Sequence, residues 1–583
     1  MGSEAALDRR IHLLDREPVD VLAREHAGEL NRVAPSNLKT YRADLVDDEV
    51  HPIADGHSQQ LSNPLRYGDP AFRSDGRGVG HRSTLSPTPA ESRAAILCDR
   101  NRLMLPRSLS WALAASFTAA LAAAPTLAAP ATVAPPPRRA VLVSIDGMSP
   151  SAYLDPDSRG LRVPNLRRLA AEGAYATAVT GVLPTNTYPT HATLVTGVPP
   201  RLHGVAGNRI FDPLFRSNFA WFWYAREIRT PTLLSAARAA GLRSASIVWP
   251  VTVGAPADLL VPEFWRTGSQ HPHDLELARA LSTPGFLDRA EAALGRPLVY
   301  WWTDAERTEL ALAAARELRP ELLLLHYAEH DKYLHEDGVG SARAHAALER
   351  IDAELGRLRA EYERLGLEDP EGGTLWAIVS DHGFLPTTTE LRPNTLLRDA
   401  GLIELDEKGE KVVSWRAFFW THGGTALLKL ADPADAATLE RVRALFAAKA
   451  AEPGSGIRRL LDAGTIAALG ADAADTPFGL DAENGSYFQA TVTGGWTAPA
   501  IDAAGHGFAP DRPEMHASLI LAGPGVRGLP VGADLGTVPM TAIAPTVAAW
   551  LGLELDPRAA APLDLLEPGP APADSALELA PAP

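Results

Sequence analysis

Short apolar runs that end at polar residues restrict the fold of this chain more than any other feature. Residues 140–145, 322–325 and 375–380 are such runs, rich in Val, Leu and Ile. Runs of this kind are typical of strands that are buried on both faces of a parallel sheet. Stretches expected to be helices lie between them, at 163–172, 230–240 and 341–365. The alternation of strands and helices predicts an α/β fold with a mostly parallel sheet.

Acidic residues follow these predicted strands. Asp146 directly follows the first run and precedes a glycine, Asp331 lies shortly after the second, and Asp381 directly follows the third. Open α/β sheets place their sites at the carboxyl ends of the strands. An aspartate before a glycine is also common in a simple turn. Because acidic residues follow three predicted strands, we favour one shared site over three unrelated turns.

The segment after the second run contains further candidate ligands. Asp331 and His335 are four residues apart, so one helical turn places both on the same face, where they can share a metal ion. His326 and His330 have the same spacing. The pattern alone leaves open which of these residues bind.

The stretch 184–197 predicts a helix that begins at Thr187. Pro189 suits the first turn, and apolar residues follow it. The unpaired N–H groups and the dipole at a helix N-terminus can bind an anion such as phosphate. The alternative is that Thr187 only caps the helix, which is a common structural role of threonine. The acidic and histidine residues elsewhere in the chain favour a functional role.

The candidate site combines carboxylates, imidazoles and one hydroxyl, without a thiolate. Its residues are Asp146, Thr187, Asp331, His335, Asp381, His382 and His506. Aspartate and histidine ligands suit zinc, and a catalytic zinc keeps one coordination position open. Two such ions about 4 Å apart clamp the attacking and leaving oxygens of a phosphoryl displacement. Metal binding would also help Thr187 to lose its proton and act as a nucleophile.

The net charge limits the class of substrate. The 583 residues carry a formal net charge of −16, which argues against binding of long nucleic acids through their phosphates. Small anionic substrates stay compatible, because bound metal ions reverse the local field. The single cysteine, Cys98, excludes an intramolecular disulfide. Export stays compatible too, because a core of this size needs no covalent link.

Residues 104–129 have the pattern of a secretory signal peptide. An arginine precedes an apolar run of about 15 residues, and small residues follow it. The alternatives are an Ala-rich core helix or a membrane anchor. Residues 1–103 show no periodicity, so we interpret them as unstructured or as an over-extended gene start, with translation beginning at Met104. We expect a periplasmic or secreted protein with no stable membrane insertion after signal cleavage.

The remaining domain boundaries follow from composition. We expect a Pro/Ala linker over 130–137, a catalytic domain over 138–556 and a disordered tail over 557–583. Within the catalytic domain, residues 385–500 lack the regular alternation. We expect them to form an insertion that bears on substrate choice.

The order of the candidate residues resembles the nucleotide pyrophosphatase/phosphodiesterase family, the type I phosphodiesterases of the alkaline phosphatase superfamily. The resemblance runs from about residue 140 to about residue 553. Its most specific parts are 187–197 with 203–208 and the Asp-His-Gly triplet 381–383. The segment 506–526 is also similar to bacterial members. The resemblance implies an alkaline phosphatase-like three-layer α/β/α sandwich with an inserted cap region.

The resemblance also implies two Zn²⁺ ions as cofactors. The implied ligands are Asp331, His335 and His506 for one ion, and Asp146, Asp381 and His382, with Thr187 beside them, for the other. His330 competes with His335 as a ligand, and we favour His335.

Three further roles are implied by the resemblance. Thr187 would be the nucleophile that forms a phosphothreonine intermediate. Asn208 would donate a hydrogen bond to a non-bridging phosphate oxygen, where a fixed donor meets developing charge. Tyr188 would lie beside the bound nucleotide or leaving group. Members usually carry Asn where this chain has Thr190, and from this departure we expect only a local rearrangement. The turn over 330–339 also differs although the ligand spacing survives, and this second departure concerns substrate preference.

The predicted function is therefore a secreted zinc-dependent phosphodiesterase or nucleotide pyrophosphatase that acts on a small nucleotide or another phosphodiester. One alternative is a phosphomonoesterase on the same scaffold, which needs extra positive charge, and Lys332 and Arg209 keep this option open. A phospholipid or phosphonate hydrolase is a second alternative. A catalytically silent, zinc-stabilised binding protein is a third, which the complete set of site residues argues against.

Overall fold

The predicted strands form the middle of an eight-stranded sheet. The computed structural model describes residues 137–217, 220–264, 274–299, 303–368, 373–524, 526 and 530–564. In sheet order the strands are β19 (Ala533–Asp534), β2 (Ala174–Tyr175), β18 (Leu519–Ala522), β7 (Thr374–Val379), β1 (Arg139–Ile145), β6 (Leu322–Tyr327), β4 (Ser244–Ile247) and β5 (Leu259–Val261).

The central strands are parallel. β1 pairs in parallel with β6 on one side and with β7 on the other. β4 pairs in parallel with β6 and β5. All residues of β1, β6 and β7 are buried, as expected for parallel strands that are covered on both faces. Antiparallel pairing begins only at β18, next to β7. The predicted mostly parallel α/β sheet is confirmed.

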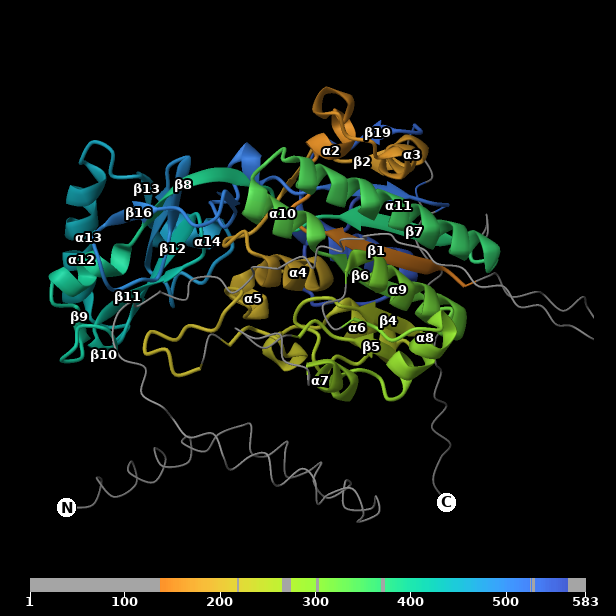
Figure 1. Cartoon of the computed structure of the whole chain (residues 1–583), viewed down its shortest axis with the longest axis horizontal. Helices are drawn as coiled ribbons and strands as arrows, with labels where there is room; N and C mark the ends of the chain where they lie inside the picture. Colours follow the sequence, from red (N-terminus) through yellow and green to blue (C-terminus); the bar gives the residue numbers. More distant parts are fainter. Residues whose placement is uncertain are drawn as a thin grey trace, which may run out of the picture. The chain divides into compact units, whose positions relative to one another are not determined.

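Helices cover both faces of this sheet (Figure 1). Successive side chains of β1 point to opposite faces, so Val141 and Val143 enter one apolar core, and Ala140 and Leu142 enter another. The helices of the first core are α3 (Pro164–Glu172), α8 (Phe286–Leu294), α9 (Asp304–Leu318) and α11 (Ala342–Arg364). Those of the second core are α4 (Thr187–Thr196), α6 (Leu233–Ala239) and α15 (Ile543–Leu551). This is the expected three-layer α/β/α sandwich.

Shorter elements connect the layers. The helices and strands among them are α2 (Ser151–Leu154), β3 (Ala178–Thr180), α5 (Pro200–His203), α7 (Asp274–Leu281), α10 (Glu329–Asp337) and β20 (Thr537–Pro539). Single 3-10 turns lie at Asp157–Arg159, Ala225–Glu227, Pro513–Met515 and Met540–Ala542. The last of these turns directly precedes α15.

The segment predicted as an insertion forms a β-rich region with its own core, drawn in teal and blue beside the sandwich in Figure 1. β11, β12, β14 and β13 form one antiparallel sheet, and β8 pairs with β15, β16 and β17 in a second group. The bounds are β8 (Leu385–Leu391), α12 (Pro393–Asp399), β9 (Ile403–Leu405), β10 (Val412–Trp415), β11 (Ala417–Thr421), β12 (Thr425–Leu430), α13 (Ala436–Ala450), β13 (Ile457–Asp462), α14 (Ala463–Ala468), β14 (Phe478–Ala482), β15 (Gly485–Phe488), β16 (Thr497–Pro499) and β17 (Ala504–Gly505).

Several predicted segments lie at or beyond the limits of the described residues. The predicted N-terminal region, the predicted signal peptide and all of the linker except Pro137 lie outside them. At the other end, ordered contacts continue past the expected boundary at 556, because Ala560 N donates to Gly197 O and Leu563 N to Thr546 Oγ1. No helix within the described ranges has the length and apolar character needed to cross a membrane.

Candidate active site

The parallel strands bring the predicted acidic residues to one edge of the sheet. Asp146 directly follows β1, and Asp381 and His382 follow β7 after a single serine. β6 leads into α10, which carries Asp331 and His335. Because β7, β1 and β6 are adjacent and parallel, their carboxyl ends meet at the same edge.

Asp331, His335 and His506 form a first group of possible metal ligands. One ligand atom from each residue lies within 4.8 Å of the others. Asp331 Oδ1 is 3.7 Å from His335 Nε2 and 4.0 Å from His506 Nε2. The one-turn spacing of Asp331 and His335 on α10 therefore does place both side chains at one point, and His506 reaches it from beyond the insertion.

Backbone carbonyls orient both histidines of this group. His335 Nδ1 lies 3.0 Å from Ala504 O, and His506 Nδ1 lies 3.1 Å from Thr185 O. A carbonyl only accepts, so each Nδ1 carries the hydrogen and each Nε2 presents a lone pair toward Asp331. Metal-binding histidines are typically oriented in this way.

A second group of possible ligands contains Asp146, Asp331 and His382. His382 Nε2 lies 3.5 Å from Asp146 Oδ1 and 3.1 Å from Asp381 Oδ2. The other oxygen of Asp381 accepts hydrogen bonds from the backbone N–H groups of Gly147 and His382. The three residues predicted for the second ion thus lie together, and Asp331 also reaches into their group.

The chemistry of these atoms fits a bound cation. Four of them are buried and have no hydrogen-bond partner within the described part of the chain: Asp146 Oδ1, Asp331 Oδ1, Asp381 Oδ2 and His382 Nε2. Buried polar atoms are normally paired, so converging unpaired acceptors indicate a missing positive charge. Oxygen and imidazole nitrogen donors in this number suit zinc.

Burial and mutual repulsion disturb the protonation of the site. Burial, reinforced by the charges of Asp331 and Asp381, raises the pKa of Asp146 well above its ordinary value. Burial also raises the pKa of Asp331 to about 6. The pKa values of His382 and His506 are lowered, first by burial and then by neighbouring histidines. Neutral imidazoles beside crowded carboxylates are the state in which such residues bind metal ions.

α4 begins at Thr187, as predicted, and its first turn contacts the ligand cluster. The cap position is occupied by Asn186, so the prediction that Thr187 itself could be only the cap is wrong. The residue before the cap, Thr185, accepts the hydrogen bond from His506. His191, one turn further on, lies 2.7 Å from Thr187 O and 3.7 Å from Asp381 Oδ2 through its Nδ1. Thr185 and His191 therefore connect the start of α4 to the ligand cluster.

Comparison with known proteins agrees with this arrangement. A model of the type I phosphodiesterase / nucleotide pyrophosphatase family matches residues 140–459, more than half of the chain. The chain belongs to this family. The match includes the predicted nucleophile and every predicted ligand except His506.

Individual relatives are distant and longer than the matched part. Ectonucleotide pyrophosphatase/phosphodiesterase family member 3 of Rattus norvegicus is 26% identical over 265 residues, which are 43% of this chain and 25% of that protein. Member 5 of Homo sapiens is 27% identical over 300 residues, or 50% of this chain and 52% of that protein. The chain thus matches between a quarter and about half of the length of these relatives.

A solved structure shares the fold. The structure of inactive murine ectonucleotide pyrophosphatase / phosphodiesterase 5, in complex with AMP, has a TM-score of 0.51 and 18% identity to this chain. The superposition covers 72% of this chain and 96% of the murine chain. The alkaline phosphatase-like fold expected from the resemblance is thereby confirmed.

Two predicted substrate contacts of this type I phosphodiesterase family member lie beside Thr187. Asn208 is half-buried, and its Oδ1 accepts a hydrogen bond of 2.9 Å from Tyr188 N. The Tyr188 side chain is fully buried, with its ring centroid 5.1 Å from that of Trp221. The Tyr188 ring is therefore not accessible in this structure, whereas Asn208 is partly exposed.

The sequence left open whether His326 and His330 are metal ligands, and in the structure neither belongs to a group of possible ligands. His330 Nδ1 faces Ala344 O at 3.0 Å, inside the packing of α10 against α11, so His330 does not join either ligand group. His326 is also buried, but its ring lies between Asp146 and Glu263. No sequence motif marked Glu263, which follows β5 and is 63 residues from His326 in the chain.

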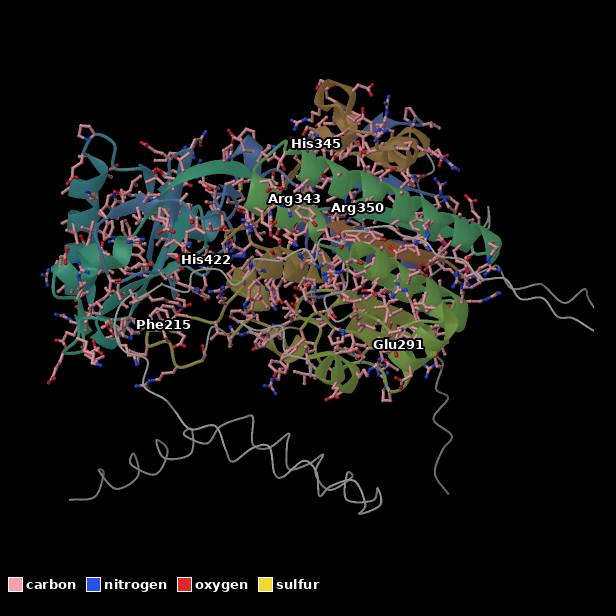
Figure 2. The ribbon with its side chains drawn as sticks, viewed as in Figure 1. Phe215, Glu291, Arg343, His345, Arg350 and His422 are labelled. Carbon is pink, nitrogen blue, oxygen red and sulfur yellow. The ribbon has the colours of Figure 1, made fainter. Side chains whose placement is uncertain are left out.

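The insertion of this family member contacts the loop that carries Asn208. Figure 2 labels His422, which lies between β11 and β12. A Cβ atom on Gly207 would be 2.9 Å from His422 Cε1 and 2.8 Å from Trp420 Cζ2, so only glycine allows this close approach. Burial lowers the pKa of His422 to about 3 and keeps its ring neutral.

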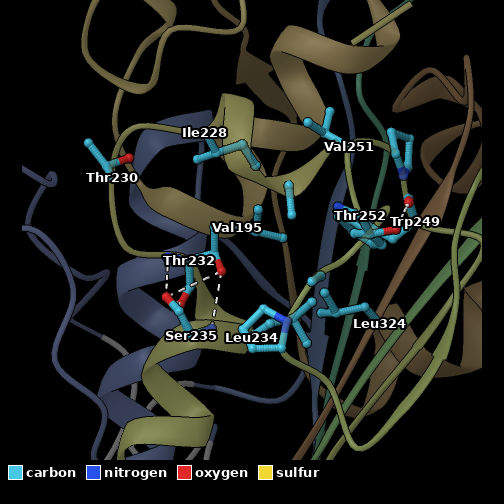
Figure 3. A pocket seen from close by; sticks show the side chains of 14 residues that line it. Val195, Ile228, Thr230, Thr232, Leu234, Ser235, Trp249, Val251, Thr252 and Leu324 are labelled. Carbon is cyan, nitrogen blue, oxygen red and sulfur yellow. Dashed lines mark hydrogen bonds between the residues drawn. The ribbon is translucent and has the colours of Figure 1, made fainter. Parts of the chain in front are cut away.

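A separate cavity of about 130 Å³ lies beside α4 (Figure 3). Its lining is largely apolar and includes Val195, Leu234, Trp249 and Leu324. The ring of Trp249 is also 5.0 Å from that of His191. No predicted ligand of the type I phosphodiesterase site lines this cavity, so we place the site at the carboxyl edge of the sheet and not here.

Proposed function

We propose that this chain is a metal-dependent phosphodiesterase or nucleotide pyrophosphatase that hydrolyses nucleotide phosphodiester or pyrophosphate bonds. The observation that carries the proposal is the convergence of two ligand groups, joined by Asp331, at the start of α4. Membership of the type I phosphodiesterase family supports this reaction class. The AMP bound to the murine relative supports a nucleoside monophosphate as part of the substrate.

We assign two Zn²⁺ ions to the site. The proposed ligands are Asp331, His335 and His506 for one ion, and Asp146, Asp381 and His382 for the other. Bound zinc supplies Lewis-acid stabilisation of the charge that develops on phosphate oxygens, and lowers the pKa of a hydroxyl group at the site. The unpaired buried acceptors of these residues support the assignment.

We assign the nucleophile to Thr187 at the N-terminus of α4. The hydroxyl of Thr187 loses its proton to solvent and its Oγ1 attacks phosphorus. A threonine–phosphate bond forms, and the bond to the leaving oxygen breaks with its electron pair on that oxygen. Water then cleaves the phosphothreonine and regenerates the hydroxyl group. The helix N-terminus orients the anionic phosphate, and the Asn208 amide donates to a non-bridging oxygen as charge develops there.

Replacement of the nucleophile tests the mechanism. Thr187→Ala should lose essentially all turnover of a nitrophenyl ester of a nucleoside monophosphate and keep its zinc content. Thr196→Ala is the matched control, because Thr196 lies on the same helix and its hydroxyl bonds backbone groups of Ala192 and Val198 instead of the site residues. Unchanged turnover in Thr187→Ala would refute the assignment.

Two further measurements separate the proposal from its rivals. Acid-quenched wild-type enzyme should yield a peptide phosphorylated at Thr187, detected by mass spectrometry. The rate with the nucleotide diester should exceed that with the corresponding phosphate monoester, because we assign no group dedicated to a dianionic phosphate. A faster reaction with the monoester would favour a phosphomonoesterase.

We also propose that the protein is exported to the periplasm or the exterior. The composition of residues 104–129 supports this location, as do the relatives, whose names describe ectonucleotide enzymes. N-terminal sequencing of the exported protein should give a mature chain that begins near residue 130. A mature chain that begins before Met104 would contradict the proposed signal peptide.

A further inference from the structure

A buried hydrogen-bond chain leads from Asp146 to the first turn of α4. His326 Nε2 lies 3.0 Å from Asp146 Oδ2, and His326 Nδ1 lies 3.0 Å from Glu263 Oε2. The second oxygen of Glu263 accepts a hydrogen bond of 3.2 Å from the Tyr188 hydroxyl. None of these four side chains is more than 4% exposed.

Both ring nitrogens of His326 are engaged within this chain. Nδ1 faces Glu263 and also the carbonyl of Val248 at 3.3 Å, and both are acceptors, so Nδ1 carries a hydrogen. Nε2 faces a carboxylate oxygen of Asp146. Both ring nitrogens are thus engaged by neighbouring acceptor groups, and His326 is absent from both ligand groups.

Because of the contact with His326, the two carboxylate oxygens of Asp146 have different surroundings. Oδ2 is paired with His326, whereas Oδ1 is buried, lacks a hydrogen-bond partner and lies 3.5 Å from His382 Nε2. Oδ1 is thus the oxygen of Asp146 that is left without a partner to face a cation. Fixing a ligand through its second atom sets its orientation and its affinity for metal.

We propose that His326 and Glu263 are positioning residues, which orient Asp146 as a one-oxygen metal ligand and connect it to the helix turn that carries the nucleophile. This inference rests on the proposed function. Glu263 contributes by holding the His326 ring with one oxygen and the Tyr188 hydroxyl with the other. Neither residue touches the substrate or the reacting atoms; they act through Asp146 and Tyr188.

A pair of substitutions at His326 tests the contact with Asp146. His326→Gln places an amide nitrogen near the position of Nε2 and can still donate to Asp146, whereas His326→Asn places one near Nδ1 and cannot reach it. We expect His326→Asn to weaken zinc binding at one of the two sites by about 10–100-fold, and His326→Gln to weaken it less. Competition with a zinc indicator dye measures both affinities, and excess zinc should restore much of the lost kcat.

Glu263→Gln is the milder variant, because it keeps the shape of the side chain. We expect the same zinc site to lose affinity, and kcat at limiting zinc to fall while KM changes little. Glu390→Gln is the matched control, since Glu390 is equally buried and accepts from Tyr487 and Arg392 instead of the site residues. The control should keep wild-type zinc affinity and turnover.

The outcomes distinguish this inference from the proposed function. If the wild type binds zinc and cleaves the diester, but Glu263→Gln and His326→Asn keep wild-type zinc affinity, the positioning role is wrong and the proposed function stands. Equal losses in His326→Asn and His326→Gln would likewise overturn the role of the Nε2 contact. A wild type that neither binds zinc nor cleaves the diester would overturn the proposed function and this inference with it.

Discussion

At the scale of single residues, the Asn208 amide has one orientation that suits its neighbour. Tyr188 N can only donate, so the atom that faces it at 2.9 Å is the Asn208 oxygen, and the amide nitrogen points the other way. The backbone at the start of α4 thus fixes a donor beside the proposed nucleophile. A donor fixed in advance stabilises developing charge without the cost of reorientation.

Substitution of Asn208 should therefore lower kcat much more than it changes KM. We expect Asn208→Ala to lose about 10²–10³-fold in kcat. Asn208→Asp keeps the acceptor for Tyr188 N but has no donor, so its loss should be at least as large. Steady-state kinetics with the nitrophenyl ester measure both values. An Asn208→Asp variant with wild-type kcat would show that the donor has no catalytic role.

At the scale of elements, Glu361 links two of the helices that cover one face of the sheet. It accepts from Arg316 of α9 and from Arg364 of its own helix, α11. Hydrogen bonds from Arg364 and then Arg316 lower the pKa of Glu361 to about 2, against burial, which acts in the opposite direction. The folded state therefore binds this proton more weakly than the unfolded chain does.

The sign of this shift predicts how the contribution of Glu361 depends on pH. A lowered pKa stabilises the fold above the ordinary glutamate value of about 4.5, and the effect disappears as the pH falls toward about 2. Glu361→Gln should lower the urea midpoint at a pH of about 6, and the difference from wild type should shrink at a pH of about 3. Glu363→Gln, an exposed change on the same helix, should have little effect at either pH. A difference that grows on acidification would contradict the assignment.

The end of α4 depends on a close approach to α15. Gly197 has φ +73°, and a Cβ atom there would lie 2.7 Å from Pro545 Cδ. Gly241 has φ +71° and no heavy atom within 4 Å of such a Cβ, so it serves as the control. We expect Gly241→Ala to cost about 1–2 kcal/mol in unfolding free energy from backbone strain. Gly197→Ala should cost about 1–3 kcal/mol more from the overlap. Urea denaturation measures the unfolding free energy of both variants. Equal losses would show that α15 moves to make room for the added Cβ atom.

The elements also show which parts of the site could be predicted from the sequence. Asp146 and Asp381 end buried strands, and Asp331 and His335 share one helical turn; these patterns are local, so they can be read along the chain. Glu263 follows β5 and His326 belongs to β6. A contact between residues of different strands leaves no periodic pattern in the sequence. The ring contact between Tyr188 and Trp221 likewise depends on a loop whose path no motif predicts.

At the scale of the whole molecule, the proposed ions connect segments from the entire length of the described chain. Asp146 lies near its start, and His506 lies beyond the insertion. Without cations, the buried carboxylates of Asp146 and Asp381 and the half-buried carboxylate of Asp331 remain close together and repel one another. Bound ions should therefore contribute to global stability as well as to the reaction.

Removal of metal should accordingly abolish diester hydrolysis and lower the thermal midpoint. Treatment with EDTA, followed by dialysis, gives the metal-depleted protein, and its metal content is measured by atomic emission. Added zinc should restore both properties, whereas EDTA that is already saturated with zinc should change neither. Metal-depleted protein that keeps wild-type turnover would contradict the proposed cofactor.

The ends of the insertion lie side by side, and this has a consequence for how the family can vary. β8 begins at Leu385 and β17 ends at Gly505, and these two residues are partners in one antiparallel ladder. His382 lies just before this ladder and His506 directly after it. The ladder fixes the spacing of the two histidines whatever the intervening chain does. We therefore expect that residues between these two strands can be replaced without displacing His382 and His506.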